Sequence, residues 1–179
     1  MRVSAEPGPC PSRFGLEFDP ARLPAGAEGQ EVVVGAFNRF KPDWAQLASR
    51  ICFHPHRYVR TRLYADDDVE VLLLCWLPGQ QTPVHDHGTS WGVSMPLCGS
   101  LVESSYVHRG AGRRMERAAE NALLPGAIAL ETGATIHRIE NASTQPAVSL
   151  HVYAPPLSTF GSYDLETGAA QIVTPPVEA

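Results

Sequence analysis

The sequence predicts an all-β fold, a sandwich or barrel of short strands that follows a helical N-terminal segment. It holds 15 glycines and 16 prolines among 179 residues, which suits many turns and few long helices. After about residue 55, short apolar runs alternate with turn signals at even spacing. Before that point, the stretch 28–52 is expected to be helical, and Trp44, Leu47, Ala48 and Ile51 within it recur at helical spacing. A hydrophobic content of 44% is enough for one packed domain and argues against disorder.

The N-terminal part divides into an arm and a helical region. Residues 1–25 are rich in Pro, Gly and Ala and are expected to form a loosely held arm. Within 28–52, Pro42, Asp43 and Trp44 mark a helix start with proline in the first turn. We expect a single domain over 26–164, followed by a C-terminal tail, 165–179; after Tyr163 the chain is expected to form a final hairpin and a frayed, Pro-rich end.

The strands follow in order along the rest of the chain. Turns rich in Gly, Pro and Asp separate the strands. The strands are expected at 58–64, 69–77, 83–87, 91–97, 101–108, 113–123, 127–130, 136–140 and 147–154. The run 69–77 is almost entirely apolar, as a strand buried on both faces would be. Cys75 and Cys98 lie in apolar runs and are expected to be small buried hydrophobic residues.

Charge and composition exclude several classes of protein. The net charge of −5 and a pI near 5.8 argue against a nucleic-acid partner, and the mild cluster of Arg109, Arg113, Arg114 and Arg117 is expected to be solvated. The longest apolar run, 71–77, is far shorter than the roughly 20 residues of a membrane span. The start of the chain does not resemble a secretory signal, and the four cysteines form no C-x-x-C pair, so a reducing cytoplasm is expected.

Two His-x-His pairs are candidate metal ligands, because residues i and i+2 of a strand face the same side. The pair His54 and His56 encloses a proline at a helix-to-strand junction and is not expected to bind. His85 and His87 have better context, since turns at Gly79 and Gly99 frame the strand that carries them. A third histidine, His137, opens a later strand, with Asn141 four residues beyond it.

This framing resembles the cupin superfamily, whose first motif is G-x5-H-x-H-x3,4-E-x6-G and whose second ends in H-x3-N. The resemblance implies that His85, His87 and His137 bind a metal. The motif's acidic ligand falls on Gly92, so the site consists of three neutral imidazoles with open positions for an anionic ligand such as a thiolate. Imidazole suits Fe, Zn, Cu and Ni, so the ligands alone leave the metal open.

Ser149, His151 and Tyr153 alternate along one strand and share a face. If the three side chains face the barrel interior, they need hydrogen bonds to one another or to a ligand. If they face outward, they need no such partners. Spacing alone leaves both arrangements open.

Longer strings carry a more specific resemblance. The segment 84–106, the block 137–141 and Ser149-x-His151-x-Tyr153-x-Pro-Pro, with Leu-Cys-Trp at 74–76 and Tyr-Val-Arg at 58–60, resemble thiol dioxygenases of the cysteine dioxygenase family. The similarity runs from about residue 40 to 164. It implies a cupin barrel with a few N-terminal helices, mononuclear iron(II), and oxidation of a small thiol by O2 to its sulfinic acid.

The same resemblance implies roles for further residues. Arg60 would grip the substrate carboxylate with two hydrogen bonds, and Tyr58 and Trp76 would line the substrate pocket. The alternatives are a surface arginine, since Arg62 shares the face of Arg60, and a tryptophan of the core. Tyr153 would point its hydroxyl at bound oxygen or at the substrate carboxylate, with His151 and Ser149 as its relay.

One position departs from part of the family. Animal members have a cysteine at the position of Gly92, crosslinked to the tyrosine that matches Tyr153, whereas bacterial members often have glycine. The crosslink is therefore excluded here, and Tyr153 must be held by hydrogen bonds alone.

Substrate and assembly stay open at this level. L-cysteine is favoured by Arg60, because dioxygenases for 3-mercaptopropionate tend to carry glutamine there. A non-catalytic metal-binding cupin and a hydrolytic zinc cupin are the alternatives of other classes. The expected partners are a small thiol and O2, and the chain is expected to be a monomer or a small homo-oligomer.

Overall fold

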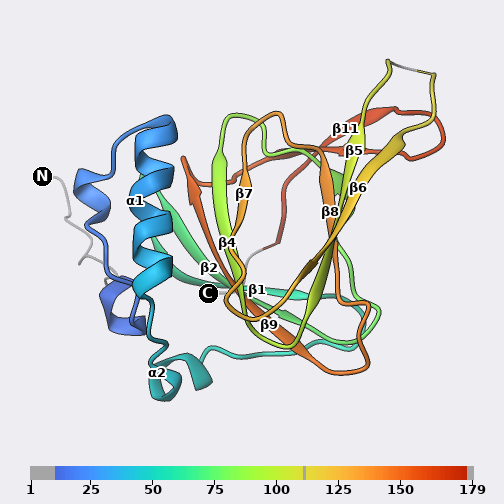
Figure 1. Cartoon of the computed structure of the whole chain (residues 1–179). Helices are drawn as coiled ribbons and strands as arrows, with labels where there is room; N and C mark the ends of the chain where they lie inside the picture. Colours follow the sequence, from blue (N-terminus) through green and yellow to red (C-terminus); the bar gives the residue numbers. More distant parts are fainter. Residues whose placement is uncertain (1–10, 111, 177–179) are drawn as a thin grey trace, which may run out of the picture.

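Two antiparallel sheets face each other in the computed structural model, which describes residues 11–110 and 112–176 (Figure 1). One sheet has the order β1-β2-β9-β4-β7 and the other β11-β10-β3-β8-β5-β6. The strands are β1 Val59–Ala65, β2 Glu70–Trp76, β3 Val84–His85, β4 Trp91–Cys98, β5 Leu101–Val107, β6 Glu116–Leu123, β7 Ala129–Glu131, β8 His137–Glu140, β9 Ala147–Ala154, β10 Phe160–Tyr163 and β11 Ala170–Val173. The all-β barrel expected from the turn spacing is confirmed.

The helical region expected over 28–52 consists of two α-helices, α1 Gly26–Arg39 and α2 Trp44–Ala48. The break falls before Pro42, because proline has no N–H to continue a helix and disfavours helical backbone at the residue before it. Asp43 then caps α2, where its side chain accepts a hydrogen bond from the backbone N–H of Gln46 at 3.2 Å. The helix start predicted at this point is therefore confirmed, except that Pro42 lies before the cap and not in the first turn.

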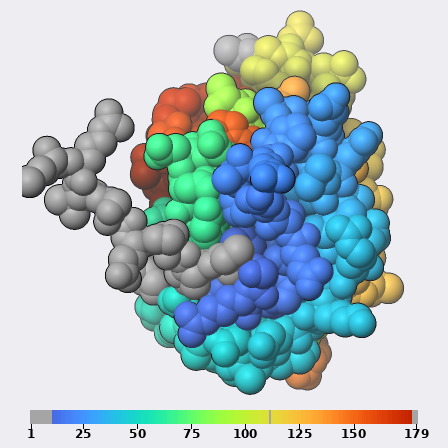
Figure 2. Space-filling view, turned by 90° about the vertical axis from the view of Figure 1, so that its left-hand side faces the viewer, coloured from blue at the N-terminus to red at the C-terminus, as the bar shows by residue number. Residues whose placement is uncertain are grey.

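The helices cover one face of the first sheet (Figures 1 and 2). Val33 and Phe37 of α1 are buried against that face, as is Leu47 of α2. Phe14 and Leu16 join the same core, in a segment with 3-10 turns at Pro11–Phe14 and Pro20–Arg22. Loose attachment of the N-terminal arm is thus wrong for 14–16, because two large apolar side chains are buried there; residues 1–10 lie outside the described part.

Strand β2 explains the division of the core into two layers. Every residue of β2 is buried, as the apolar run predicted. Leu73 and Cys75 pack under the helices, whereas Leu72 and Trp76 pack between the two sheets with side chains of the opposite sheet such as Ile139. The barrel interior is therefore the space between the sheets, and side chains alternate into it.

Strand β9 follows the same alternation. Val148, Leu150 and Val152 belong to the core under the helices, so the residues between them face the barrel interior. Ser149, His151 and Tyr153 are all buried on that inner face. The choice that spacing left open between the interior and an outward face is settled in favour of the interior.

The two cysteines differ from each other. Cys75 is buried, as expected, but Cys98 is exposed, so the prediction for it is wrong. Cys98 ends β4 beyond a register shift in its pairing with β9, next to the turn at Gly99, where φ is +71°. At the rim of the barrel, a residue of β4 is no longer covered by the neighbouring elements that bury the centre of the strand.

The C-terminal segment adds a strand to the barrel. β11 pairs with β10 from Phe160↔Val173 to Tyr163↔Ala170, and this hairpin extends the second sheet. Residues 177–179 of the expected tail lie outside the described part. Within the described residues, neither α-helix has the length and apolar character needed to cross a bilayer.

Candidate metal centre

Three histidines meet inside the barrel. His85 on β3 is paired with His137 on β8, and His87 follows two residues after His85. Their ring centroids are 4.7 to 5.0 Å apart, and one ligand nitrogen of each lies within 4.8 Å of the others. All three side chains are buried. The structure thus brings together the three residues that the two sequence motifs indicated.

Hydrogen bonds leave free ring nitrogens on this group. Nδ1 of His85 donates to the carbonyl of Pro83 at 3.0 Å, and Nδ1 of His137 is 2.7 Å from Oε1 of Glu103. Nε2 of His137 and both ring nitrogens of His87 are buried without a hydrogen-bond partner. Because unpartnered buried nitrogens are costly, and several converge here, the donor set fits a bound divalent metal.

The protonation of these rings suits metal binding. Burial, and after it the neighbouring His137, lowers the pKa of His85 to about 3. Burial likewise lowers the pKa of His87 to about 2, with His85 as the next cause. Both imidazoles are therefore neutral at physiological pH, which is the form that binds a metal.

Asp86, between the two ligand candidates, fixes the short segment that carries them. Its Oδ1 accepts hydrogen bonds from the backbone N–H groups of Gly88 and Gly161 at 3.0 and 2.9 Å. The hydroxyl of Tyr163 donates to its Oδ2 at 2.6 Å. Asp86 therefore ties β3 to β10 and holds His85 and His87 in place.

Two carboxylates lie beside the trio, and sequence reasoning missed both. Glu103 on β5 bonds His137, and Glu131 on β7 accepts a hydrogen bond from the hydroxyl of Ser94 at 2.8 Å. Together with His137, these two acids form a second group of possible metal ligands, which is distinct from the three histidines. Burial raises the pKa of Glu131 to about 7, opposed by the nearby His137. The trio is accordingly flanked by carboxylates without being capped by one.

A buried chain of hydrogen bonds runs along the inner face of β9. The indole N–H of Trp76 donates to Ser149 Oγ at 2.9 Å, Ser149 Oγ lies 2.8 Å from His151 Nε2, and His151 Nδ1 lies 3.1 Å from Tyr153 Oη. Burial lowers the pKa of His151 to about 3 and raises that of Tyr153 well above its usual value. Both groups are therefore neutral. The hydrogen bonds that His151 makes with Ser149 and Tyr153 can each run in either direction, depending on which ring nitrogen carries the proton.

The chain of hydrogen bonds ends at Tyr153, beside the histidine trio. The ring of Tyr153 stacks on His87 with centroids 5.5 Å apart and an interplanar angle of 29°. The phenol of Tyr153 thus borders the part of the barrel interior that holds the three histidines, here called the chamber. Trp76 serves two contacts: besides its bond to Ser149, it stacks on Tyr58 at 4.6 Å and 17°.

The structure separates the two arginines of β1. Arg60 is 5% exposed, whereas the Arg62 side chain is 49% exposed. Nη2 of Arg60 lies 3.7 Å from Oε1 of Glu70, and its Nε and Nη2 have no hydrogen-bond partner. Glu70 is buried, and burial raises its pKa against the opposing effect of Arg60. Arg60 is therefore a buried cation with free donors.

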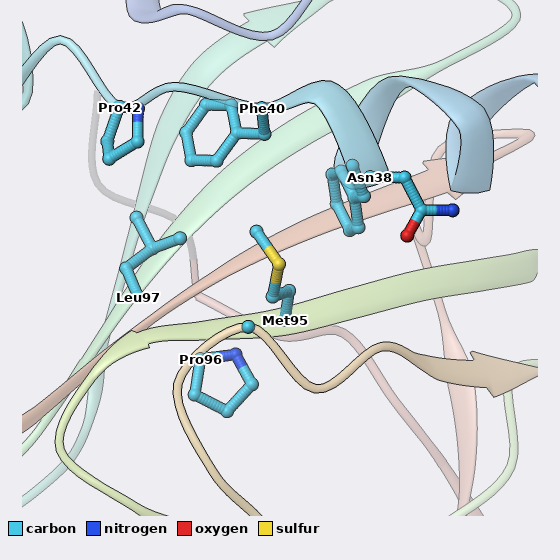
Figure 3. A pocket seen from close by; sticks show the side chains of 8 residues that line it. Asn38, Phe40, Pro42, Met95, Pro96 and Leu97 are labelled. Carbon is cyan, nitrogen blue, oxygen red and sulfur yellow. The ribbon is translucent and has the colours of Figure 1, made fainter.

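Other candidate features lie away from this chamber. His54 accepts a hydrogen bond at Nδ1 from the backbone N–H of His56, and neither joins a metal-binding group in the described part of the chain. A pocket of about 330 Å³ between the end of α1 and β4 is lined by Phe40, Met95 and Leu97 (Figure 3). Met95 belongs to the core under the helices, so β4 separates this pocket from the histidines.

The fold and the donor set define a cupin with a candidate metal centre. A solved structure from Klebsiella pneumoniae, an uncharacterised conserved protein with a double-stranded β-helix domain, is similar in fold, with a TM-score of 0.51 at 19% identity; 74% of this chain and 89% of that one are covered.

Sequence comparison narrows the class. Residues 25–166 match the family "Cysteine dioxygenase type I". The chain is 30% identical to cysteine dioxygenase type 1 of Homo sapiens over 151 residues, which cover 82% of this chain and 74% of the human one. Identity to the Rattus norvegicus enzyme is 31% with the same coverage. The chain belongs to the cysteine dioxygenase type I family and is an oxidoreductase of the dioxygenase class.

Proposed function

We propose that this protein is a thiol dioxygenase that holds iron(II) through His85, His87 and His137 and oxidises L-cysteine to its sulfinic acid. The observation that carries the proposal is the adjacency of the trio, with its unpartnered nitrogens, to the buried phenol of Tyr153. When bound, iron(II) supplies redox chemistry and open positions for a thiolate and O2. Both oxygen atoms go to sulfur, which loses the four electrons that O2 gains, so no further reductant is needed.

Arg60 binds the substrate carboxylate in this proposal. A buried guanidinium with unpartnered Nε and Nη2 is prepared to donate two hydrogen bonds to one carboxylate. Its near neighbour Glu70 offsets part of the cost of burying the charge, but at 3.7 Å it makes no hydrogen bond with Nη2. The donors of Arg60 therefore stay free for substrate.

Tyr153 holds a proton at its hydroxyl beside the reacting atoms. Because Trp76 can only donate to Ser149 Oγ, the serine hydroxyl is free to donate to His151 Nε2. His151 Nδ1–H then donates to Tyr153 Oη, and the phenol proton points into the chamber. Ser149 and His151 thus orient Tyr153, which donates a hydrogen bond to substrate or to oxygen.

The remaining residues shape the chamber. Tyr58 and Trp76, stacked on each other, form an aromatic wall, and Tyr58 is also close enough to Arg60 for the cation to oppose the rise in its phenol pKa. A wall of this kind excludes water from the barrel and strengthens the electrostatic grip of Arg60.

The test combines metal content with oxygen uptake. Purified protein is loaded anaerobically with iron(II), zinc or no metal, and oxygen consumption is followed with L-cysteine, 3-mercaptopropionate and cysteamine. We expect uptake with iron(II) alone and the highest kcat/KM with L-cysteine. H87A should lose iron and turnover together, whereas H56A, outside the trio, should keep both.

Each alternative predicts a different outcome. A 3-mercaptopropionate dioxygenase prefers that thiol over cysteine, a hydrolytic zinc cupin consumes no oxygen, and a non-catalytic cupin binds metal without turnover of any thiol. Iron binding and full activity in H87A would remove that histidine from the ligand set.

A further inference from the structure

Three of the four cysteines lie near one another, at the end of the first sheet to which the chain returns after α2. Cys75 on β2 is buried, whereas Cys52, which follows α2, and Cys98, at the end of β4, are exposed. Both exposed thiols are close enough to Cys75 to act on its charge. None of the three belongs to the histidine trio. One buried thiol near two exposed thiols makes this cluster a candidate for disulfide chemistry.

Cys52 lies beside the residue that pairs with Cys75. A bridge between His54 and Arg57 folds the chain back after α2, so that the segment before the bridge returns alongside the start of β1. Cys52 and Val59 accordingly line one pocket of about 350 Å³. Val59 is the direct partner of Cys75 across β1 and β2. The backbone N–H of Cys52 also donates toward the sulfur of Cys75, which brings the two residues into contact.

Cys98 is placed less favourably for a bond to Cys75. Both residues are paired with Val148 of β9, one from each side. Neighbouring strands lie about 4.8 Å apart, so roughly 10 Å separates the Cα atoms of Cys75 and Cys98. A disulfide requires Cα atoms within about 7 Å of each other. Cys52 is therefore the partner that the fold offers to Cys75.

We propose that Cys52 and Cys75 form a reversible disulfide when the protein is exposed to a low-molecular-weight disulfide, which makes this edge of the first sheet a thiol-exchange site separate from the metal centre. The inference goes beyond the proposed function and does not depend on it. The bond ties the segment before β1 to β2, next to the stacked rings of Tyr58 and Trp76. It opens again when the surrounding thiols are reduced.

The exchange takes two balanced steps. The Cys52 thiol loses its proton to solvent, and its thiolate attacks one sulfur of the small disulfide RSSR; the S–S bond breaks and one RS⁻ leaves. The sulfur of Cys75 then loses its proton to solvent and attacks the Cys52 sulfur of this mixed disulfide, and the second RS⁻ leaves. Each RS⁻ takes up a proton, so two protein thiols are oxidised and one RSSR is reduced to two RSH.

Exposure decides the order of the steps. Burial raises the pKa of Cys75 to about 11, so this thiol reacts slowly with solutes, whereas Cys52 is open to them. In the mixed disulfide, the Cys52 sulfur is held beside Cys75, and this proximity offsets the small fraction of thiolate. Cys52 is therefore the attacking residue, and Cys75 is the residue that resolves the mixed disulfide.

The experiment locates the oxidised sulfurs. Iron-loaded protein is reduced with dithiothreitol, desalted and incubated anaerobically with bis(2-hydroxyethyl) disulfide. The remaining thiols are blocked with N-ethylmaleimide in acidic denaturant, and the disulfides are assigned by peptide mass spectrometry. Cys52→Ser removes the attacking thiol. Cys98→Ser is the matched control, because it removes the other exposed thiol of the cluster and leaves Cys52 and Cys75 in place.

We expect wild type and Cys98→Ser to yield a peptide pair joined through Cys52 and Cys75, and dithiothreitol to restore both thiols. In Cys52→Ser, oxidation of Cys75 should fall at least about tenfold, because the buried thiol has lost the residue that reacts first.

Three results would overturn the inference. The first is a Cys75 thiol that stays free in wild type, with or without a lasting mixed disulfide on Cys52. The second is a disulfide that joins any other two of the four cysteines. The third is equal oxidation of Cys75 in wild type and in Cys52→Ser. Should Cys52→Ser not fold, the peptide map of wild type decides by the first two results.

Discussion

Replacing Gly92 with alanine tests the close packing beside Tyr153 directly. The added Cβ would lie 2.5 Å from Oε2 of Glu131 and under 3.0 Å from two ring carbons of Tyr153. Neither neighbour moves freely, since Ser94 holds the carboxylate and His151 bonds the phenol. Overpacking of a buried site costs about 1–3 kcal/mol, and we expect a loss of about 2 kcal/mol in the free energy of unfolding of Gly92→Ala.

Urea unfolding of the metal-free protein measures this loss, and a double-mutant cycle assigns it. Glu131→Ala removes the atom that would clash most closely, so the double variant should be more stable than the sum of the single effects by about 1 kcal/mol or more. The control is Gly35→Ala in α1, where the new Cβ is no closer than 3.4 Å to its nearest neighbour, the end of the Arg39 side chain.

Gly35→Ala should stabilise the protein by about 0.5–1 kcal/mol, because alanine loses less backbone entropy in a helix than glycine. The argument for crowding at Gly92 is refuted if Gly92→Ala is as stable as wild type, or if its effect adds simply to that of Glu131→Ala.

Three further predictions follow from ionisable groups in and around the chamber. Arg60→Met should lower the free energy of unfolding by about 3 kcal/mol, because it removes the buried cation beside Glu70 and leaves that carboxylate with only the half-exposed Arg62 at 3.9 Å and the backbone N–H of Leu157, whereas Arg62→Met should cost less than about 1 kcal/mol; similar urea midpoints for the two variants would contradict this. The pKa of His151 is lowered to about 3 in the folded protein, against about 6.5 in the unfolded chain. Between these two values only the unfolded state gains a proton, so the free energy of unfolding decreases as the pH is lowered from about 6.5 to about 3. Between pH 7 and pH 5 the metal-free wild type should lose about 2 kcal/mol more than His151→Gln, and parallel pH curves would reject the assignment. Glu103→Gln should weaken iron binding about tenfold to a hundredfold in chelator competition, because its carboxylate orients the metal-facing histidine of β8; an unchanged affinity would show that this bond is dispensable.

The barrel could be predicted because its signals are local. Alternation and turn residues placed the strands, and β9 was expected over the range that it occupies, 147–154. The motif spacing singled out His85, His87 and His137, although the strand expected over 83–87 is shorter in the structure: β3 ends at His85, and His87 lies just beyond it. Alternation also indicated that Ser149, His151 and Tyr153 share a face, because every second residue of a strand points the same way.

The sequence by itself therefore determined which residues share a strand and a face, whereas only the tertiary structure decided which face is inside and what lies across from it. Burial of Val148 and Leu150 under the helices turned the polar side of β9 inward. Cross-strand register brought Glu131 opposite Gly92 and into the chamber. Periodicity is a property of neighbours along the chain, but a carboxylate that reaches the chamber from another strand is placed by packing and hydrogen bonds between segments far apart in sequence.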